Sequence, residues 1–157
     1  MPQLHVGDAA PLFSLPDQTG TVHSLKDLRG SWILLYFYPK DDTPGCTTEA
    51  CSIRDAWSDF SKQKAKVFGI STDPVKSHAK FAEKFHLPFP LLADSEKMMV
   101  EDYGVWGKKK FMGREYLGTM RTSFLIDPKG KIAKVYEGVK PALHAEEVLK
   151  DLKEMSA

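Results

Sequence analysis

The chain has 157 residues, of which 42% are hydrophobic and 27% are charged, a composition typical of a soluble globular protein of one domain. Its formal net charge of +1 is too small for a broad electrostatic attraction to nucleic acid or to an anionic membrane. The N-terminal residues lack the basic start and apolar stretch of a secretory signal, so we expect a cytoplasmic protein. We therefore predict a single domain over residues 1–157 that has neither a nucleic-acid nor a membrane partner.

The N-terminal part of the chain predicts an edge hairpin, a buried strand and a helix. The segment 32–38 is continuously apolar, as expected of a central strand covered on both faces, and Pro39 ends it. A loop then leads to Cys46, where an apolar pattern of period 3.6 begins. The expected elements are hairpin strands at 13–15 and 21–23, a helical turn capped at Ser24, a strand at 32–38, and a helical pattern from Cys46 whose buried face holds Ala50, Ile53, Trp57 and Phe60.

The rest of the chain alternates strands and helices and closes with a hairpin and a helix. Asp73 and Pro74 suit the N-cap and the first position of a helix. The turn at 127–130 has type I chemistry, and the three-lysine run at 108–110 is expected in a solvated loop or at a strand end. The expected elements are strands at 66–71, 91–92, 121–126 and 131–136, a helix to about residue 85 that buries Val75, Ala79, Ala82 and Phe85, a helix ending at 103–104, and a helix at 144–155 with Val148, Leu149, Leu152 and Met155 on one side.

This order of elements predicts an α/β layer sandwich. A cysteine on the turn between a central strand and the helix that follows it favours a thioredoxin-like fold. We expect a central mixed β-sheet flanked by helices, with an N-terminal hairpin extension. The Cys-x-x-Cys motif of thioredoxin itself is absent.

Cys46 stands at the N-terminal end of the apolar helix stripe, in the first turn. Unpaired backbone amides and the positive end of the helix dipole favour a thiolate at such a position. The thiolate, not the thiol, is the reactive nucleophile. The alternative is a small buried cysteine that happens to fall in a first turn, and the position alone leaves both interpretations open.

Cys51 follows five residues later on the same predicted helix. That spacing corresponds to a rise of about 7.5 Å and a rotation of about 140°. The two Cα atoms would then lie about 8 to 9 Å apart, beyond the limit of roughly 7 Å for an unstrained disulfide. A disulfide would require the first turns of the helix to unwind, which favours a redox cycle over a structural bridge. An ordinary helix residue remains the alternative for Cys51.

The motif around Cys46 resembles a known active-site signature. Pro39-x-x-x-Thr43-x-x-Cys46 is similar to the signature of the peroxiredoxins, and the string TPGCT at 43–47 with EAC at 49–51 resembles the bacterioferritin comigratory protein subgroup, or Q type. The resemblance covers nearly the whole chain. The further matching segments are 36–41, 69–71 with 77–78, 87–89 with 91–94, 103–106 and 121–127.

The resemblance implies a role for each residue of the motif. Cys46 would be the peroxidatic cysteine, which attacks the terminal oxygen of a hydroperoxide and becomes a sulfenic acid. Arg121 would keep Cys46 ionised and steady the charge that develops on the leaving oxygen. The hydroxyl of Thr43 and the backbone amides of Gly45 and Cys46 would hold the peroxide, and Pro39 would shield the pocket from water.

The resemblance also implies how the cycle closes. Cys51 would attack the sulfenic acid to give an intramolecular disulfide, which thioredoxin or a related dithiol would reduce. Glu49 would orient Arg121, although a solvated strand-end arginine and a helix-surface carboxylate are the alternatives for these two residues. The cycle needs no metal, flavin or haem, and the five histidines lack metal-ligand spacing. Because the resolving thiol lies in the same helix, we expect a monomer.

Three competing interpretations remain open on the sequence. A thiol-disulfide oxidoreductase on the same fold would carry Cys-x-x-Cys, whereas this chain has four residues between its cysteines. A stress-related binding protein with vestigial cysteines would not consume peroxide through Cys46. Within the main interpretation, Cys51 could be dispensable if a partner's thiol resolves Cys46.

Overall fold

The central sheet has five strands in the order β5-β4-β3-β8-β9 and is mixed, as predicted. The middle strand β3 (Trp32–Phe37) runs parallel to β4 (Ala65–Ser71), which runs parallel to β5 (Leu91–Ala93). On its other side β3 pairs antiparallel with β8 (Thr122–Ile126), and β8 pairs antiparallel with β9 (Ile132–Tyr136). This computed structural model describes residues 4–156.

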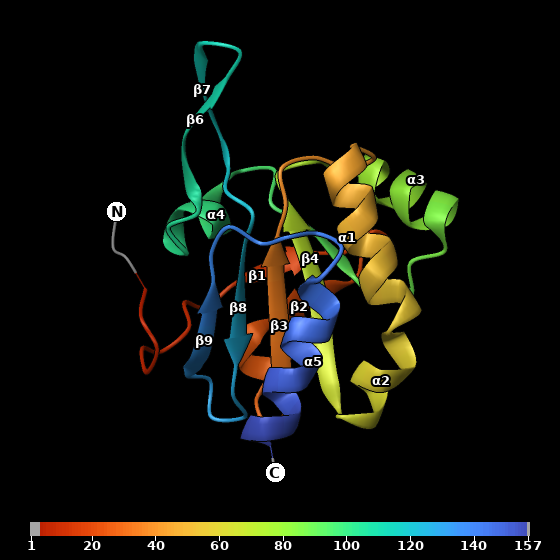
Figure 1. Ribbon diagram of the computed structural model, residues 1–157, viewed down its shortest axis with the longest axis vertical. Helices are drawn as coiled ribbons and strands as arrows, with labels where there is room; N and C mark the ends of the chain where they lie inside the picture. The colour runs from red at the N-terminus through yellow and green to blue at the C-terminus, as the bar shows by residue number, and fades with distance from the viewer. Residues whose placement is uncertain (1–3, 157) are drawn as a thin grey trace.

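Helices cover both faces of the sheet, which explains why β3 is continuously apolar (Figure 1). Leu34 and Tyr36 of β3 point into one core cluster, which contains side chains of α1, α2, α3 and α5. Ile33 and Leu35 point into the other, which contains side chains of the N-terminal segment and α4. The helical elements are η1 (Leu25–Leu28), α1 (Pro44–Asp55), α2 (Trp57–Lys62), α3 (Val75–Phe85), α4 (Met98–Asp102) and α5 (His144–Met155).

Two small hairpins accompany the sheet. The predicted N-terminal hairpin is present, with β1 (Ser14–Pro16) antiparallel to β2 (Val22–Ser24). The second, β6 (Trp106–Phe111) with β7 (Arg114–Thr119), was not predicted and projects beyond the body of the protein (Figure 1). Both residues between these strands have positive φ, as a type I′ turn requires, but the dipeptide Met-Gly lacks the Asn or Asp that usually announces such a turn.

The helical pattern that begins at Cys46 belongs to two helices. Ala56 separates α1 from α2, because its backbone N–H bonds to Ile53 at 3.1 Å as well as to Ser52, which tightens the last turn of α1. Trp57 therefore lies on α2 and is only half-buried. Phe60 on the same short helix is buried as predicted.

The remaining helices follow their predicted positions, with three differences. Ser24 precedes η1 but makes no side-chain cap; its hydroxyl donates to Ser14 instead. The buried residues of α3 are His78 and Phe81, whereas the four expected residues are half-buried. Met155, at the end of α5, is exposed rather than packed. Within residues 4–156, no helix is both long enough and apolar enough to cross a membrane.

Candidate active site

Cys46 occupies the third position of α1, in the first turn as predicted. Thr43 is the N-cap and Pro44 the first helical residue, so the fixed φ of proline starts the helix. The first intrahelical bond comes from the N–H of Thr47 to the carbonyl of Thr43 at 2.8 Å. The amides of Gly45 and Cys46 therefore have no partner within the helix and are oriented toward its N-terminal end. The Cys46 side chain is buried and its thiol is free.

Arg121 connects Cys46 to Glu49. It immediately precedes β8, and its Nη2 donates to the Cys46 sulfur at 3.3 Å while its Nη1 donates to Glu49 Oε1 at 2.9 Å. The Arg121 side chain is 19% exposed and that of Glu49 is fully buried. Both alternatives from the sequence are thus wrong, since Arg121 is not a solvated strand-end residue and Glu49 is not a surface carboxylate.

Glu49 is a buried carboxylate with only one of its oxygens bonded. Burial raises the pKa of Glu49 to about 7, against the opposing effect of the Arg121 guanidinium. Among the described residues, Glu49 Oε2 and the Tyr36 hydroxyl are both buried without a hydrogen-bond partner. Burial, followed by the negative charges of Glu49 and Cys46, raises the pKa of Tyr36 as well. Tyr36 on β3 thus belongs to the surroundings of this site; the sequence placed it in a segment that matches the family but gave it no role.

The loop before α1 places the other predicted site residues. The Thr43 hydroxyl donates to the carbonyl of Lys40 at 2.8 Å, which leaves its lone pairs free to accept. A Cβ added at Gly45 would lie 3.0 Å from Arg121 Nη2, so the absence of a side chain there permits the close approach of the guanidinium. Pro39 is half-buried just beyond β3, and its shielding role stays a prediction.

Cys51 lies on the same unbroken helix as Cys46. It is half-buried and its thiol is free. The helix is intact over both cysteines. At a spacing of five residues on an intact helix, their Cα atoms lie too far apart for an unstrained disulfide. The need to unwind α1 before a disulfide forms stays a prediction.

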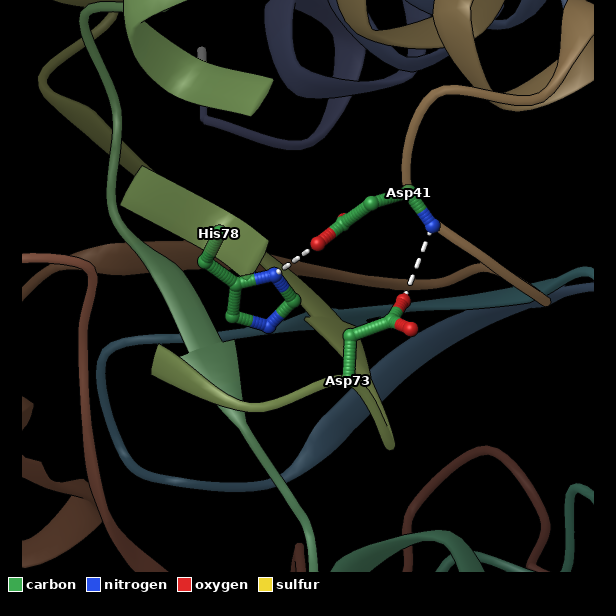
Figure 2. Close-up of side chains that lie close together, drawn as sticks. All are labelled: Asp41, Asp73 and His78. Atoms are coloured by element: carbon green, nitrogen blue, oxygen red, sulfur yellow. Dashed lines mark hydrogen bonds and ion pairs between the residues drawn. The ribbon is translucent and has the colours of Figure 1, made fainter. Parts of the chain in front are cut away.

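A second polar cluster holds the loop that leads to Cys46, and sequence reasoning missed it. Figure 2 shows Asp41, Asp73 and His78 pointing toward one another. His78 Nδ1 lies 2.7 Å from Asp41 Oδ2, and Asp73 Oδ2 accepts from the backbone N–H of Asp41 at 2.8 Å. Asp73 also accepts from the Ser71 hydroxyl, so it fastens this loop and does not cap α3 as predicted; Pro74 is the N-cap.

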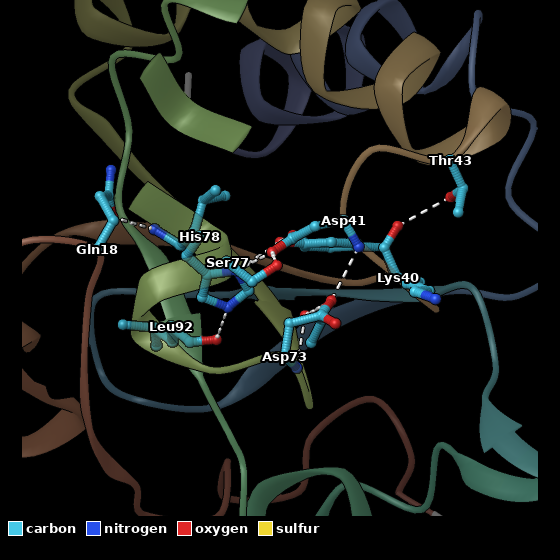
Figure 3. Close-up of polar contacts among 11 residues, drawn as sticks. Gln18, Lys40, Asp41, Thr43, Asp73, Ser77, His78 and Leu92 are labelled. Carbon is cyan, nitrogen blue, oxygen red and sulfur yellow. Dashed lines mark hydrogen bonds and ion pairs between the residues drawn. The ribbon is translucent and has the colours of Figure 1, made fainter. Parts of the chain in front are cut away.

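Further bonds complete this cluster (Figure 3). The Tyr38 hydroxyl donates to Asp41 Oδ1 at 2.6 Å, and the Ser77 hydroxyl donates to Asp41 Oδ2 at 2.8 Å. His78 Nε2 lies 2.9 Å from the Leu92 carbonyl, which can only accept, so that nitrogen carries a proton. His78 is buried on the inner face of α3, and the sequence signal for it was the family resemblance of the segment 77–78.

The same three side chains place ligand atoms within 4.8 Å of one another, a spacing that a metal ion could use. The bonded carboxylate oxygens of Asp41 and Asp73, and both nitrogens of His78, already have hydrogen-bond partners within the protein. Hydrogen bonding therefore accounts for this cluster without an ion. The absence of a metal cofactor stays a prediction.

The fold and the cysteine site can now be compared with known proteins. The model of the AhpC/TSA family matches residues 6–135. The chain belongs to this family. It is 50% identical to a putative peroxiredoxin bcp of Coxiella burnetii over 93% of this chain and 97% of that protein. It is 49% identical to peroxiredoxin Bcp of Escherichia coli over 98% and 99% of the two chains.

Solved structures agree. Peroxiredoxin Q of Xanthomonas campestris superposes with a TM-score of 0.88 at 38% identity, covering 92% of each chain. A cysteine mutant of PrxQ from Xylella fastidiosa gives a TM-score of 0.94 at 34% identity over the full length of both. The predicted thioredoxin-like fold and the predicted peroxiredoxin subgroup are thus confirmed, and the chain is a thiol peroxidase.

Proposed function

We propose that Cys46 is the nucleophile of this peroxidase. Its thiolate attacks the terminal oxygen of a hydroperoxide, the O–O bond breaks, and the leaving oxygen departs as an alcohol, or as water when the substrate is hydrogen peroxide, after taking up a proton. Cys46 becomes a sulfenic acid. The observation that carries the proposal is the Arg121 guanidinium, which donates to the Cys46 sulfur with one nitrogen and to a buried carboxylate with another.

The surrounding groups suit this step. The Arg121 charge favours the thiolate and stabilises the charge that moves onto the leaving oxygen. The free amides of Gly45 and Cys46 are donors for the peroxide, and the Thr43 hydroxyl has lone pairs available to accept from it. Glu49 orients Arg121 through the 2.9 Å bond, so the guanidinium keeps a fixed position beside the sulfur.

We propose that Cys51 resolves the sulfenic acid. After the first turns of α1 unwind, its thiolate attacks the Cys46 sulfur, the S–O bond breaks, and an intramolecular disulfide forms. The hydroxyl group leaves as water after taking up a proton. A dithiol protein of the thioredoxin type then reduces this disulfide by exchange. A resolving thiol in the same helix removes the need for a second subunit, which supports a monomer. Two free thiols suit a reducing compartment such as the cytoplasm.

The test is peroxide consumption with thioredoxin, thioredoxin reductase and NADPH, for wild type, Cys46→Ser and Cys51→Ser. We expect turnover in wild type, no reaction in Cys46→Ser, and a single turnover without recycling in Cys51→Ser. Fragment mass spectra of the oxidised wild type should locate a Cys46–Cys51 link. Peroxide consumption that survives in Cys46→Ser would contradict the assignment of the nucleophile. Full recycling in Cys51→Ser would instead assign resolution to a partner's thiol.

A further inference from the structure

The three-lysine run on β6 does not behave as a uniformly solvated segment. Lys108 and Lys110 are exposed, whereas Lys109 is half-buried. The Lys109 Nζ donates to the carbonyl of Thr119 at 3.0 Å, at the base of the projecting hairpin (Figure 1). One lysine of the run therefore turns back from the hairpin toward the body of the protein.

Two glycines make room for this path. Gly107 and Gly118 face each other across the hairpin, so a stretch of its surface has no side chains. The Lys109 side chain lies over Gly118, where an added Cβ would be 3.1 Å from Lys109 Cδ and 3.3 Å from the Tyr116 ring. A Cβ at position 118 would therefore require Lys109 or the Tyr116 ring to shift by a few tenths of an ångström, and a longer side chain would occupy the path of Lys109.

The ammonium ends close to the peroxidase site. Thr119, which holds it, is two residues from Arg121, and Lys109 and Arg121 line the same cavity of about 640 Å³. Burial and the neighbouring Arg121 charge lower the pKa of Lys109, while the charge of Cys46 acts in the opposite direction. Lys109 thus shares a cavity with Arg121, the guanidinium that donates to the Cys46 sulfur, and the two like charges repel each other.

Two carboxylates lie near these two cations. Glu49 faces Arg121 from α1, and Glu137 lines the cavity beyond the end of β9. Tyr36 on β3 is kept neutral by burial, since its pKa is raised. Glu137 is exposed, whereas Glu49 is buried and already paired with Arg121, so Lys109 adds a further positive charge near the guanidinium that bonds the Cys46 sulfur.

We propose that Lys109 is a positioning residue of the peroxidase, whose charge, held beside Arg121, increases the fraction of Cys46 present as thiolate. The proposal rests on Cys46 being the nucleophile. Lys109 acts on the thiolate through the electrostatic potential of its charge and does not bond the sulfur. A unit charge several ångströms away, at a partly solvated site, typically displaces a titration by about half to one pH unit.

Substitutions at Lys108 and Lys110 provide matched controls. Each removes the same charge from the same hairpin, but at an exposed position. The reduced full-length protein is alkylated with iodoacetamide between about pH 5 and 9. Fragment mass spectra then separate labelling at Cys46 from labelling at Cys51. We expect the midpoint for Cys46 to rise by about half to one pH unit in Lys109→Gln, a roughly three- to tenfold smaller thiolate fraction below the midpoint. Lys108→Gln and Lys110→Gln should stay at the wild-type midpoint, and Lys109→Arg should restore it.

A second variant moves the charge without removing it. Gly118→Leu places a branched side chain in the space that Lys109 crosses, well beyond the small shift that a Cβ alone requires, and should raise the same midpoint while the net charge is unchanged. Circular dichroism establishes that each variant is folded. If Lys109→Gln shifts the midpoint no more than Lys108→Gln does, the inference is overturned while the assignment of Cys46 stands. If wild-type Cys46 is alkylated no faster than Cys51 at any pH, both the inference and the proposed nucleophile are overturned.

Discussion

Replacement of Glu49 by glutamine removes the most perturbed carboxyl group of the active site. Glu49 is fully buried, and burial raises its pKa from 4.5 to about 7 in spite of the Arg121 charge. In the unfolded chain the carboxyl returns to its ordinary pKa. Between these two values the folded protein holds a proton that the unfolded chain has released. Folding stability must therefore fall as the pH rises through this window.

The size of this effect follows from the shift. The pKa difference is about 2.5 units, from 4.5 to about 7, and each unit corresponds to about 1.4 kcal/mol. The free energy of unfolding of wild type should thus fall by about 3 kcal/mol, relative to Glu49→Gln, between about pH 4.5 and 7. Above about pH 7 the difference between the two proteins should be constant, because both states of wild type are then ionised.

The assay is urea unfolding of the reduced protein at several pH values from about 4.5 to 8. Glu101→Gln is the control, because Glu101 is an exposed carboxyl on another helix. Its stability should run parallel to that of wild type. If Glu49→Gln also runs parallel to wild type, Glu49 is not the buried, proton-holding group described above. Because unwinding of α1 would also free Glu49, the same result predicts that disulfide formation becomes more favourable as the pH rises toward 7.

Three further substitutions test the surroundings of the site. In Arg121→Lys, the ammonium cannot bond the sulfur and Glu49 with two arms of one planar group. We expect the rate constant for the reaction of Cys46 with peroxide, measured by stopped flow, to fall about 100-fold. A change under about threefold would contradict the role of Arg121. His78→Ala removes the ring that bonds the buried carboxylate of Asp41. The free energy of unfolding in urea should fall by about 3 kcal/mol. An unchanged urea midpoint would show that the pair does not contribute to stability. Gly69→Ala places a Cβ 2.7 Å from the Tyr36 hydroxyl and should lower the stability by about 1 to 3 kcal/mol in thermal unfolding; an unchanged Tm would mean that the ring moves freely.

The sequence predicted most of the central sheet and the position of the nucleophile. The continuously apolar segment at 32–38 predicted a strand covered on both faces, and β3 (Trp32–Phe37) is that strand. Cys46 lies in the first turn of α1. Pro44 and the apolar stripe that follows Cys46 determine where this helix begins. The roles of Arg121 and Glu49 depended on the family resemblance, since nothing local distinguishes a buried ion pair from two surface charges separated by 72 residues.

The features that were missed depend on contacts between segments far apart in the chain. Asp73 would be a good helix cap by its local sequence, but its carboxylate bonds the loop at Asp41, 32 residues away. The β6–β7 hairpin is rich in charge and has an unusual turn, so neither alternation nor turn chemistry revealed it. Lys109 differs from its two neighbours only because the hairpin places it over a glycine.

The two polar clusters divide the active site into a fixed part and a releasable part. Asp41 fastens the loop before α1 to α3 through its Oδ2, which bonds Ser77 and His78, and to the loop after β4 through its backbone N–H, which donates to Asp73. Its Oδ1 accepts from Tyr38, and none of these partners lies in α1. The first turns of α1 are joined to β8 through the bonds of Arg121 to Cys46 and Glu49. When Cys46 becomes a neutral sulfenic acid, the acceptor of the first of these bonds loses its negative charge, and Glu49 becomes the main partner of the guanidinium. Oxidation thus weakens the contacts that must break for Cys51 to reach Cys46, while the loop that carries Thr43 keeps its anchors.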